Sequence, residues 1–226
     1  MSFEPNISQS EVFNNFKSID AQAYRNIVRY YERHENAIAL LEFEEYFELL
    51  LAYSNALFEI SEYRKHINLA KVVIETSIVE NITYFRGEEV YMTALLKKAV
   101  SHYYLFQFEQ SEHILKEMLK INAQDSEVVR VLSHVYRDNP PRYLRWARAL
   151  SILFFLTSAI VISLEMLVIR HFFESLTPFV EWSRNILFAS GVGVYVLCEL
   201  WHRWQVARKV RFFLKWCTRK EEKTGD

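Results

Sequence analysis

The sequence has few of the residues that build tight turns. Its 226 residues include only 4 Gly and 4 Pro, well below the average usage of about 7% and about 5%. β-Sandwiches, β-barrels and glycine-rich nucleotide-binding folds depend on such turns, so the composition argues against all three. Between Pro5 and Gly87 the chain contains neither residue. We therefore expect an all-α fold.

Residues that carry catalysis or bind metals do not occur in the required patterns. Cys198 and Cys217 fit neither a disulfide framework nor a metal-ligand spacing. The seven histidines form no HExxH motif, and the chain has no phosphate-binding loop and no nucleophile elbow. Glu62 and Glu109 each precede a histidine by four residues, which permits a shared metal ion but is not the spacing of helical di-metal sites. We expect no enzymatic activity, no cofactor and no metal.

Charge is unevenly divided along the chain. Residues 1–138 hold 14 Lys and Arg against 21 Asp and Glu, a net charge of −7, whereas residues 139–226 hold 13 against 7, a net charge of +6. A basic half favours a membrane surface or a nucleic acid as its partner. Residues 1–30 are charged throughout and lack the apolar core of a signal peptide. We expect residues 1–138 to form a cytosolic helical domain.

Two long apolar runs occupy residues 139–226. The first extends from Trp146 to Ile169, and the second from Ile186 to about Trp204. About 20 helical residues cross a hydrocarbon core of about 30 Å, so both runs are predicted to span a membrane as a hairpin. Two buried core helices of a soluble protein are the alternative, but the first run is apolar on every face.

Positive residues flank this hairpin at its open end. Arg142, Arg145 and Arg148 precede the first run and a basic segment follows the second, whereas the connection carries two Arg against two Glu. Positively charged flanks stay in the cytoplasm. We therefore expect both termini inside, the short connecting loop outside, and a location in the inner membrane of a bacterium.

Two glutamates lie within the apolar runs, where an uncompensated charge is costly. Glu165 is near the outer end of the first run and Glu199 is near the inner end of the second, so the two lie at different depths. Arg203 follows Glu199 by four residues, and Arg170 or Arg184 is within reach of Glu165. Local pairing is one interpretation, and a polar face between protomers is the other.

Small residues in the second run favour close helix association. Ala189 and Gly193 are four residues apart, which fits the small-xxx-small pattern of membrane helix contacts. The contact is either within the hairpin or between copies. Together with Glu165 and Glu199 this pair defines a possible oligomer face, and we expect a homo-oligomer in the membrane.

After the second run the pattern becomes amphipathic and basic. Val206, Val210 and Phe213 follow helical spacing while the cations take the other faces, which predicts a helix on an anionic lipid surface. Nucleic-acid binding is the competing use of such charge, but lipid phosphate is the nearer anion beside a membrane span, and we expect no direct nucleic-acid partner. The predicted membrane-surface cations are Arg203, Arg208, Lys209, Arg211 and Lys215.

The cytosolic region is predicted to be a series of amphipathic helices. Ser61 and Asp125 are expected N-caps, and Gly87 is expected to break the chain before Glu88 and Glu89 begin the next helix. Short connections imply antiparallel helical hairpins. The predicted helices are 8–17, 20–35, 37–60, 62–84, 88–105, 108–122 and 126–138.

The stretch YLFQFEQSEHILKEMLKINAQDSEVVRVLSHVY resembles a tetratricopeptide repeat. Phe108 is the aromatic residue after the turn and Ser111 the small residue three positions on; an earlier copy centres on Tyr63. Tyr63 and Phe108 are 45 residues apart rather than the 34 of that repeat, and His66 stands where the repeat has a small residue. The resemblance, over residues 40–138 at most, implies stacked helical hairpins whose concave surface binds peptides or proteins.

This resemblance implies a set of candidate contact residues for a protein partner. The cationic clamp that some members use for C-terminal carboxylates is not reproduced. The candidates are Asn55, Lys97, Tyr103, Tyr104, Arg130, His134 and Arg137.

Two classes of function remain. In the first, the chain is a non-enzymatic anchored adaptor, whose cytosolic domain binds a protein partner and whose hairpin couples that partner to the inner membrane. In the second, it is a membrane effector whose hairpins assemble and depolarise or permeabilise the bilayer when triggered. The second resembles two-span toxic effectors of prokaryotic antiviral defence in architecture only. An effector should be harmful when overexpressed, whereas an adaptor should not.

Overall fold

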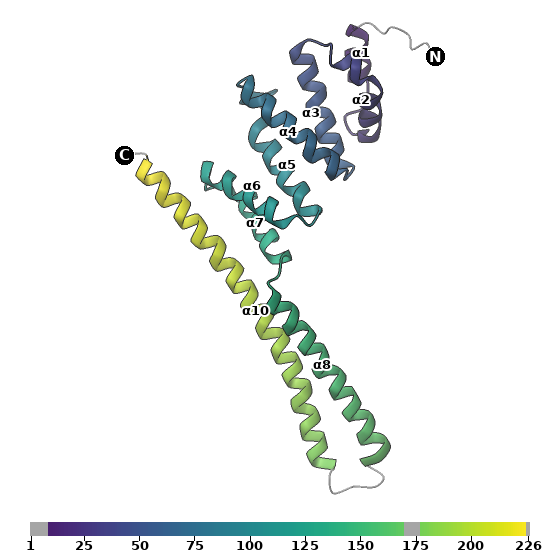
Figure 1. Cartoon of the computed structure of the whole chain (residues 1–226), viewed down its shortest axis with the longest axis vertical. Helices are drawn as coiled ribbons and strands as arrows, with labels where there is room; N and C mark the ends of the chain where they lie inside the picture. The colour runs from purple at the N-terminus through teal and green to yellow at the C-terminus, as the bar shows by residue number, and fades with distance from the viewer. Residues whose placement is uncertain (1–8, 170–176, 225–226) are drawn as a thin grey trace. The chain divides into compact units, whose positions relative to one another are not determined.

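The computed structural model describes residues 9–169 and 177–224, which divide into a helical unit, Met1–Leu132, and a hairpin unit, Ser133–Asp226. The described residues are almost entirely helical, which confirms the expected all-α class. In the helical unit, successive helices pack against one another in chain order, as Figure 1 shows. Its helices are α1 (Gln9–Lys17), α2 (Tyr24–Ile38), α3 (Phe43–Glu59), α4 (Tyr63–Val79), α5 (Val90–Tyr104) and α6 (Phe108–Ile121), and α7 (Ser126–Asp138) crosses the division between the units.

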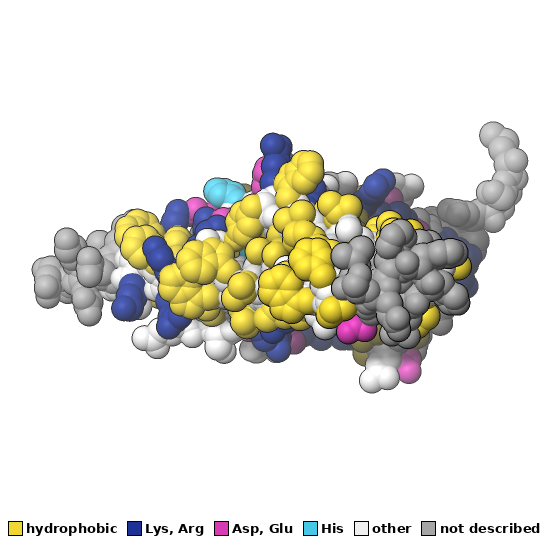
Figure 2. Space-filling model, turned by 90° about the horizontal axis from the view of Figure 1, so that it is seen from below, with side chains coloured by type: hydrophobic (Ala, Val, Ile, Leu, Met, Phe, Trp, Pro, Cys, Tyr) yellow, Lys and Arg dark blue, Asp and Glu magenta, His cyan; other side chains and the backbone are white. Residues whose placement is uncertain are grey.

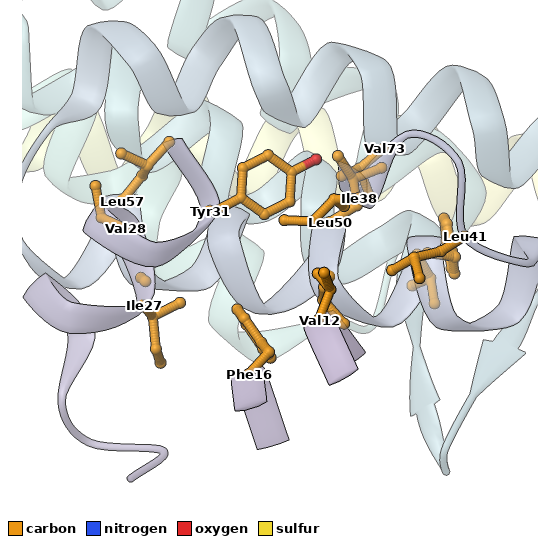
Figure 3. Packing of buried hydrophobic residues seen from close by; sticks show 14 residues of the cluster. Val12, Phe16, Ile27, Val28, Tyr31, Ile38, Leu41, Leu50, Leu57 and Val73 are labelled. Carbon is orange, nitrogen blue, oxygen red and sulfur yellow. The ribbon is translucent and has the colours of Figure 1, made fainter. Parts of the chain in front are cut away.

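The core of the helical unit lies among its first four helices. Val12 and Phe16 of α1 lie against α2, whose Tyr31 is 6% exposed and points into the cluster drawn in Figure 3. The ring of Tyr31 also stacks on that of Tyr53 of α3, with centroids 4.1 Å apart and planes at 8°. Stacked aromatic pairs of this kind add to the free energy of simple area burial. The amphipathic pattern read from the sequence therefore produces a packed unit with its own core.

Three helices of this unit end in a left-handed residue that is not glycine. Ser61, Asn81 and Phe106 follow α3, α4 and α5 with φ of 65°, 53° and 59°. After α3, the N–H of Glu62 donates to the carbonyl of Leu57 at 2.9 Å, and equivalent bonds after α4 and α5 measure 2.8 and 2.9 Å. These are Schellman motifs, which normally use glycine. At these three positions, polar or aromatic residues thus replace the usual glycine, although the left-handed conformation is strained for a residue with a side chain.

The two expected N-caps have different outcomes. Ser61 occupies the left-handed position at the end of α3, so Glu62 becomes the N-cap of α4 and makes no side-chain capping bond. The Ser61 prediction is wrong because the residue is used to end one helix instead of beginning the next. Asp125 does cap α7, since its Oδ1 accepts the N–H of Glu127 at 2.9 Å and of Val128 at 3.2 Å.

A short β-hairpin, absent from the predicted elements, precedes α5. Strands β1 (Tyr84–Phe85) and β2 (Glu88–Glu89) pair antiparallel, so Glu88 and Glu89 do not begin the helix as expected. Arg86 and Gly87 connect the strands with φ of 52° and 87°. Two successive positive φ values define a type I′ turn, the geometry that matches the twist of paired strands. Gly87 therefore turns a hairpin as well as ending the preceding segment.

The hairpin unit contains two helices long and apolar enough to cross a membrane. Helix α8 (Arg142–Leu164) continues into the π-helical turn η1 (Glu165–Ile169), and α10 (Thr177–Thr224) packs along α8. The predicted spans 146–169 and 186–204 lie within these elements. The basic segment after Trp204 is not a separate helix, because α10 is continuous through all of its 48 residues. Arg170 lies outside the described residues.

Candidate functional site

A groove in the helical unit brings two of the predicted contact residues together. Its volume is about 440 Å³, and it is bordered by α1, the loop after α1, the start of α2, and one face of α3. Asn55 of α3 and Lys97 of α5, 42 residues apart in sequence, both line it. The lining residues are Phe16, Lys17, Ile19, Ala21, Tyr24, Ile27, Glu48, Ala52, Asn55, Glu59 and Lys97.

Lys97 has only neutral neighbours as direct partners. Its Nζ donates a hydrogen bond of 2.8 Å to Oδ1 of Asn55 and lies 5.7 Å from the centre of the Phe58 ring. No carboxylate of the described residues forms an ion pair with it. A partly buried ammonium held by an amide and an aromatic face has uncompensated charge. Lys97 is therefore placed to attract an acidic group.

The other positive charges near the groove, unlike Lys97, are paired with a carboxylate. Glu48 accepts from Lys17 and from Arg86, at 2.5 Å each, and its side chain is 13% exposed. Through Glu48, the end of α1 and the turn of the β-hairpin are both tied to α3. This bridging fixes one wall of the groove while leaving Lys97 as a separate positive site.

A buried histidine lies between α4 and α5. His66 of α4 is 1% exposed, and its Nδ1 lies 2.8 Å from Oγ of the fully buried Ser101 of α5. Burial, and secondarily the positive charge of Lys97, lower the pKa of His66 to about 4. The ring is therefore neutral at physiological pH. His66 and Lys97 also border a second cavity of about 50 Å³ between α3, α4 and α5.

The remaining predicted contacts lie elsewhere. Tyr103 and Tyr104 are at the end of α5, where Tyr104 stacks on Tyr63 with centroids 4.8 Å apart. Arg130 pairs with Glu127 at 3.5 Å. On the part of α7 that belongs to the hairpin unit, His134 and Arg137 contact each other at 2.6 Å.

The sequence did not reveal that α1 and the following loop border the groove. Lys17, Tyr24 and Glu59 line it together with Asn55, but no motif marks them. Their meeting depends on the packing angle of α1 on α2, which the spacing of apolar residues does not specify.

The two apolar stretches of the hairpin unit expose most of their apolar residues and bury several polar ones. Only 17% and 11% of the most apolar windows of its two long helices are buried, and Figure 2 shows hydrophobic side chains spread over this surface. Core helices of a soluble protein bury such residues instead. Three polar residues of this unit are almost completely buried: Ser151, Ser158 and Glu165, at 2%, 2% and 1% exposure. This distribution fits helices surrounded by lipid.

The contact between α8 and α10 follows a seven-residue repeat. Leu144, Ser151, Ser158 and Glu165 are spaced by seven residues and are all buried, the spacing expected for a left-handed helix pair; Ser151 and Glu165 bond directly to α10. A Cβ added to Gly191 on the facing helix would lie 3.2 Å from Cβ of Phe154. The glycine thus permits close approach at the centre of the hairpin.

Two interhelical ion pairs mark the ends of an uncharged zone. Glu165 accepts from Arg184 at 2.9 Å, and Glu199 accepts from Arg148 at 3.2 Å; Arg203 also reaches Glu199, at 3.5 Å. Between these pairs, residues 149–164 and 185–198 contain no Asp, Glu, Lys or Arg. At 1.5 Å per residue they extend for about 24 and about 21 Å. Each glutamate is thus paired within the chain, at opposite ends of the zone.

Ala189 and Gly193 lie outside the contact between α8 and α10. Ala189 is exposed, and a Cβ built on Gly193 meets no atom within 4 Å. The small-xxx-small pattern predicted that Ala189 and Gly193 allow close helix approach. Within the hairpin, it is Gly191 that lies against the facing helix. The pair remains available to another helix.

The five predicted membrane-surface cations are exposed on α10. Arg208 lies over the ring of Trp204 at 5.3 Å, and Lys209 lies 5.9 Å from the ring centre of Tyr136. The guanidinium of Arg211 donates to the carbonyl of Ala207 at 3.2 Å. The exposed set is Arg203, Arg208, Lys209, Arg211 and Lys215.

Comparison with known proteins gives no assignment: no protein family, curated protein or solved structure matches the chain. Among the described residues no three His, Cys, Asp or Glu side chains gather in a way that would hold a metal ion. The class defined by the structure is an all-α protein with a helical unit and two helices long and apolar enough to span a membrane.

Proposed function

We propose that the protein is a non-enzymatic membrane-anchored adaptor. The helical unit binds a protein partner, and the hairpin of α8 and α10 holds it at the inner membrane of a bacterium. The observation that carries the proposal is the reversed burial of the hairpin unit, with apolar residues outside and Ser151, Ser158 and Glu165 inside. Such a surface is stable in lipid and prone to aggregate in water.

The positive charges at the open end of the hairpin favour one orientation in the membrane. Both the start of α8 and the segment of α10 after Glu199 are basic, and these regions lie at the same end of the hairpin. Positive flanks remain on the cytoplasmic side. The termini and the helical unit are accordingly cytoplasmic, and the loop between η1 and α10 is outside.

The groove and two equivalent helix-connecting turns support partner binding by the helical unit. The turns at residues 61–63 and 106–108 each have a left-handed residue at the equivalent position, equivalent hydrogen bonds, and an aromatic residue at the start of the next helix. Two equivalent helical hairpins, α3–α4 and α5–α6, support the resemblance to tetratricopeptide repeats, which bind partners on the surface of their first helices. Asn55 and Lys97 lie on those first helices.

The charge around Lys97 indicates the chemistry of the partner. A carboxylate of a bound segment would compensate the charge of the Lys97 ammonium and accept a charge-assisted hydrogen bond from it. The groove walls also offer the rings of Phe16 and Tyr24 to apolar side chains. The proposed partner is a protein segment with an acidic residue flanked by apolar ones.

Photocrosslinking tests this function in the full chain in membranes. A photoreactive amino acid in place of Ala52 should capture one partner, and Lys97→Glu should reduce the yield about tenfold by repelling its carboxylate. Lys98→Glu is the matched control, because this neighbouring lysine does not line the groove. Equal loss, or equal retention, in both variants would contradict the proposed site.

The effector alternative is less well supported. Two helices alone cannot enclose a water path, so permeability requires several hairpins with polar groups turned toward neighbouring copies. Both intramembrane glutamates are instead paired with arginines of their own chain. The adaptor is therefore the proposal we favour.

A further inference from the structure

Two contacts set the register between the start of α8 and the middle of α10. The hydroxyl of Tyr143 donates to Oε1 of Gln205 at 2.8 Å, and Arg148 pairs with Glu199 at 3.2 Å. This antiparallel register places the first two turns of α8 beside the turns of α10 that follow Glu199. Five arginines therefore lie at one level of the hairpin unit, and we name them the arginine collar. They are Arg142, Arg145, Arg148, Arg203 and Arg208.

The arginine collar has more positive charge than the chain neutralises. Glu199 is the only carboxylate of the described residues that pairs with it, and that carboxylate is shared by two of the five arginines. Arg142 and Arg145 are exposed and make no ion pair within the described residues. Arg208 lies over the face of Trp204, which leaves its N–H groups free to bind an anion.

Tryptophans at the same level indicate where the collar lies in a bilayer. Trp146, Trp201 and Trp204 are 77%, 54% and 47% exposed around the two helices. Tryptophan side chains of membrane proteins concentrate at the interface between hydrocarbon and headgroups. The collar spans roughly 10 Å along the helices, enough to extend through one headgroup layer of about 5–8 Å.

We propose that the arginine collar is a binding site for the phosphate headgroups of anionic phospholipids. The planar guanidinium forms paired hydrogen bonds with phosphate oxygens, and basic clusters beside membrane helices recognise anionic lipids. The inference deepens the proposed anchoring and rests on it, since it names the lipid class that the anchor selects. It also assigns a binding role to Arg142 and Arg145, which from the sequence alone served only to predict the orientation of the hairpin in the membrane.

The opposite end of the hairpin provides an internal comparison. Arg184 is neutralised there by Glu165 at 2.9 Å, and Trp182 is 65% exposed. A tryptophan therefore stands at each end of the hairpin, but the described residues show surplus arginine charge only at the collar. The two ends can be examined separately because all five tryptophans lie in residues 139–226.

Tryptophan quenching by brominated lipids tests the proposal in the full chain. The collar reporter carries Trp182→Phe and Trp216→Phe, and the end reporter keeps Trp182 alone. Each is inserted into vesicles of four parts phosphatidylcholine to one part phosphatidylglycerol, with bromine on either lipid. For the collar reporter, quenching per mole of brominated lipid should be at least about twofold greater for the anionic lipid, since each interfacial arginine favours it up to about fivefold. For the end reporter the ratio should be near one.

Charge removal then identifies the residues. Arg142→Gln, Arg145→Gln and Arg208→Gln together should return the collar ratio to near one, whereas Arg64→Gln in the helical unit should leave it unchanged. A ratio near one for the unsubstituted collar, with normal quenching by brominated phosphatidylcholine, would overturn lipid selection and leave the anchor standing. No quenching by either lipid would overturn both, because the hairpin would then not be in the bilayer.

Discussion

The hydroxyl of Ser151 donates a hydrogen bond of 2.9 Å to the backbone carbonyl of Gly191, joining the two long helices at the centre of their contact. Ser158, one heptad further along α8, is equally buried, but its hydroxyl has no hydrogen-bond partner within the described residues. A membrane helix pair relies on close packing and such polar contacts because lipid supplies no hydrophobic drive between helices. The position of Gly191 therefore decides how closely α8 and α10 approach.

Replacement of Gly191 by Leu should open the hairpin. The added side chain meets Phe154 and Phe155 at 3.2 and 3.4 Å from its first carbon alone, and such overpacking typically costs about 1–3 kcal/mol. Disulfide crosslinking between cysteines introduced at Ser158 and Leu187 should fall severalfold. Gly193→Leu is the control, because open space surrounds that position; an equal effect of both substitutions would contradict the described contact.

Reporter fusions should show that both termini are cytoplasmic. Fusions after Asp138 and after Asp226 are expected to be active only with a cytosolic reporter, and a fusion near Thr177 only with an external one, because the basic flanks lie at the open end of the hairpin. Enzyme activities of paired cytosolic and periplasmic reporters measure this. Cytosolic activity of the middle fusion would reject the two-span arrangement.

Residues 1–138 expressed alone should be soluble and helical. Their net charge is −7, and the cluster centred on α1–α4 supplies a core that does not involve the hairpin. Circular dichroism and gel filtration check this expectation. Aggregation of the purified fragment would show that its exposed apolar residues need another part of the chain.

The stability of that fragment should depend on the protonation of His66. Burial lowers the pKa of this group to about 4 in the folded state, below the usual value of about 6.5 in the unfolded chain. The unfolded state therefore binds the proton more strongly, so stability is full above about pH 6.5 and falls by up to about 3 kcal/mol as the pH drops toward 4. Urea unfolding at several pH values measures the slope.

His66→Gln should remove most of this slope, whatever its effect on stability at neutral pH. His113→Gln is the control, because His113 is exposed. An unchanged pH dependence in the His66 variant would assign the slope to other groups.

Glu165→Leu with Glu199→Leu separates the adaptor from the effector. For an adaptor, the wild-type chain should not depolarise cells when overexpressed with its partner and trigger, and the double variant should still insert and bind the partner. Breaking both ion pairs should nevertheless loosen the hairpin, because it leaves arginines without their carboxylates. A potential-sensitive dye gives the readout. Depolarisation by the wild-type chain that the double variant loses would establish the effector instead.

The helices were predictable because their signals are local. Apolar periodicity located α5, α6 and α7 to within two residues of their observed ends, and composition located both long apolar helices. Arg203 was foreseen as a neighbour of Glu199 for the same reason, since the two are four residues apart. For Glu165 the sequence offered Arg170 or Arg184, and the structure pairs it with Arg184 across the hairpin. The contribution of Arg148 to Glu199 was not foreseen, because it depends on the register between α8 and α10.

The remaining features depend on contacts between distant segments. The β-hairpin at Gly87 is only two residues per strand, too short for an alternating pattern to stand out. Asn55 and Lys97 were singled out by a family resemblance, but their direct hydrogen bond requires the packing of α5 next to α3. The continuation of α10 past Trp204 was missed because a change from apolar to basic residues resembles a boundary, although it leaves the backbone hydrogen bonding intact.

For the proposed transmembrane hairpin, the two interhelical ion pairs also set the bilayer thickness that it would match. The uncharged zone between them measures about 24 Å on α8 and about 21 Å on α10, less than an average hydrocarbon core of about 30 Å. In a membrane of that thickness the arginines must extend toward the headgroups or the lipid must thin around the hairpin, and either adjustment costs a fraction of a kcal/mol for each ångström of mismatch. Short-chain lipids relieve that cost. For the proposed membrane-anchored hairpin, the spacing of Arg148 and Arg184 therefore favours thinner regions of membrane.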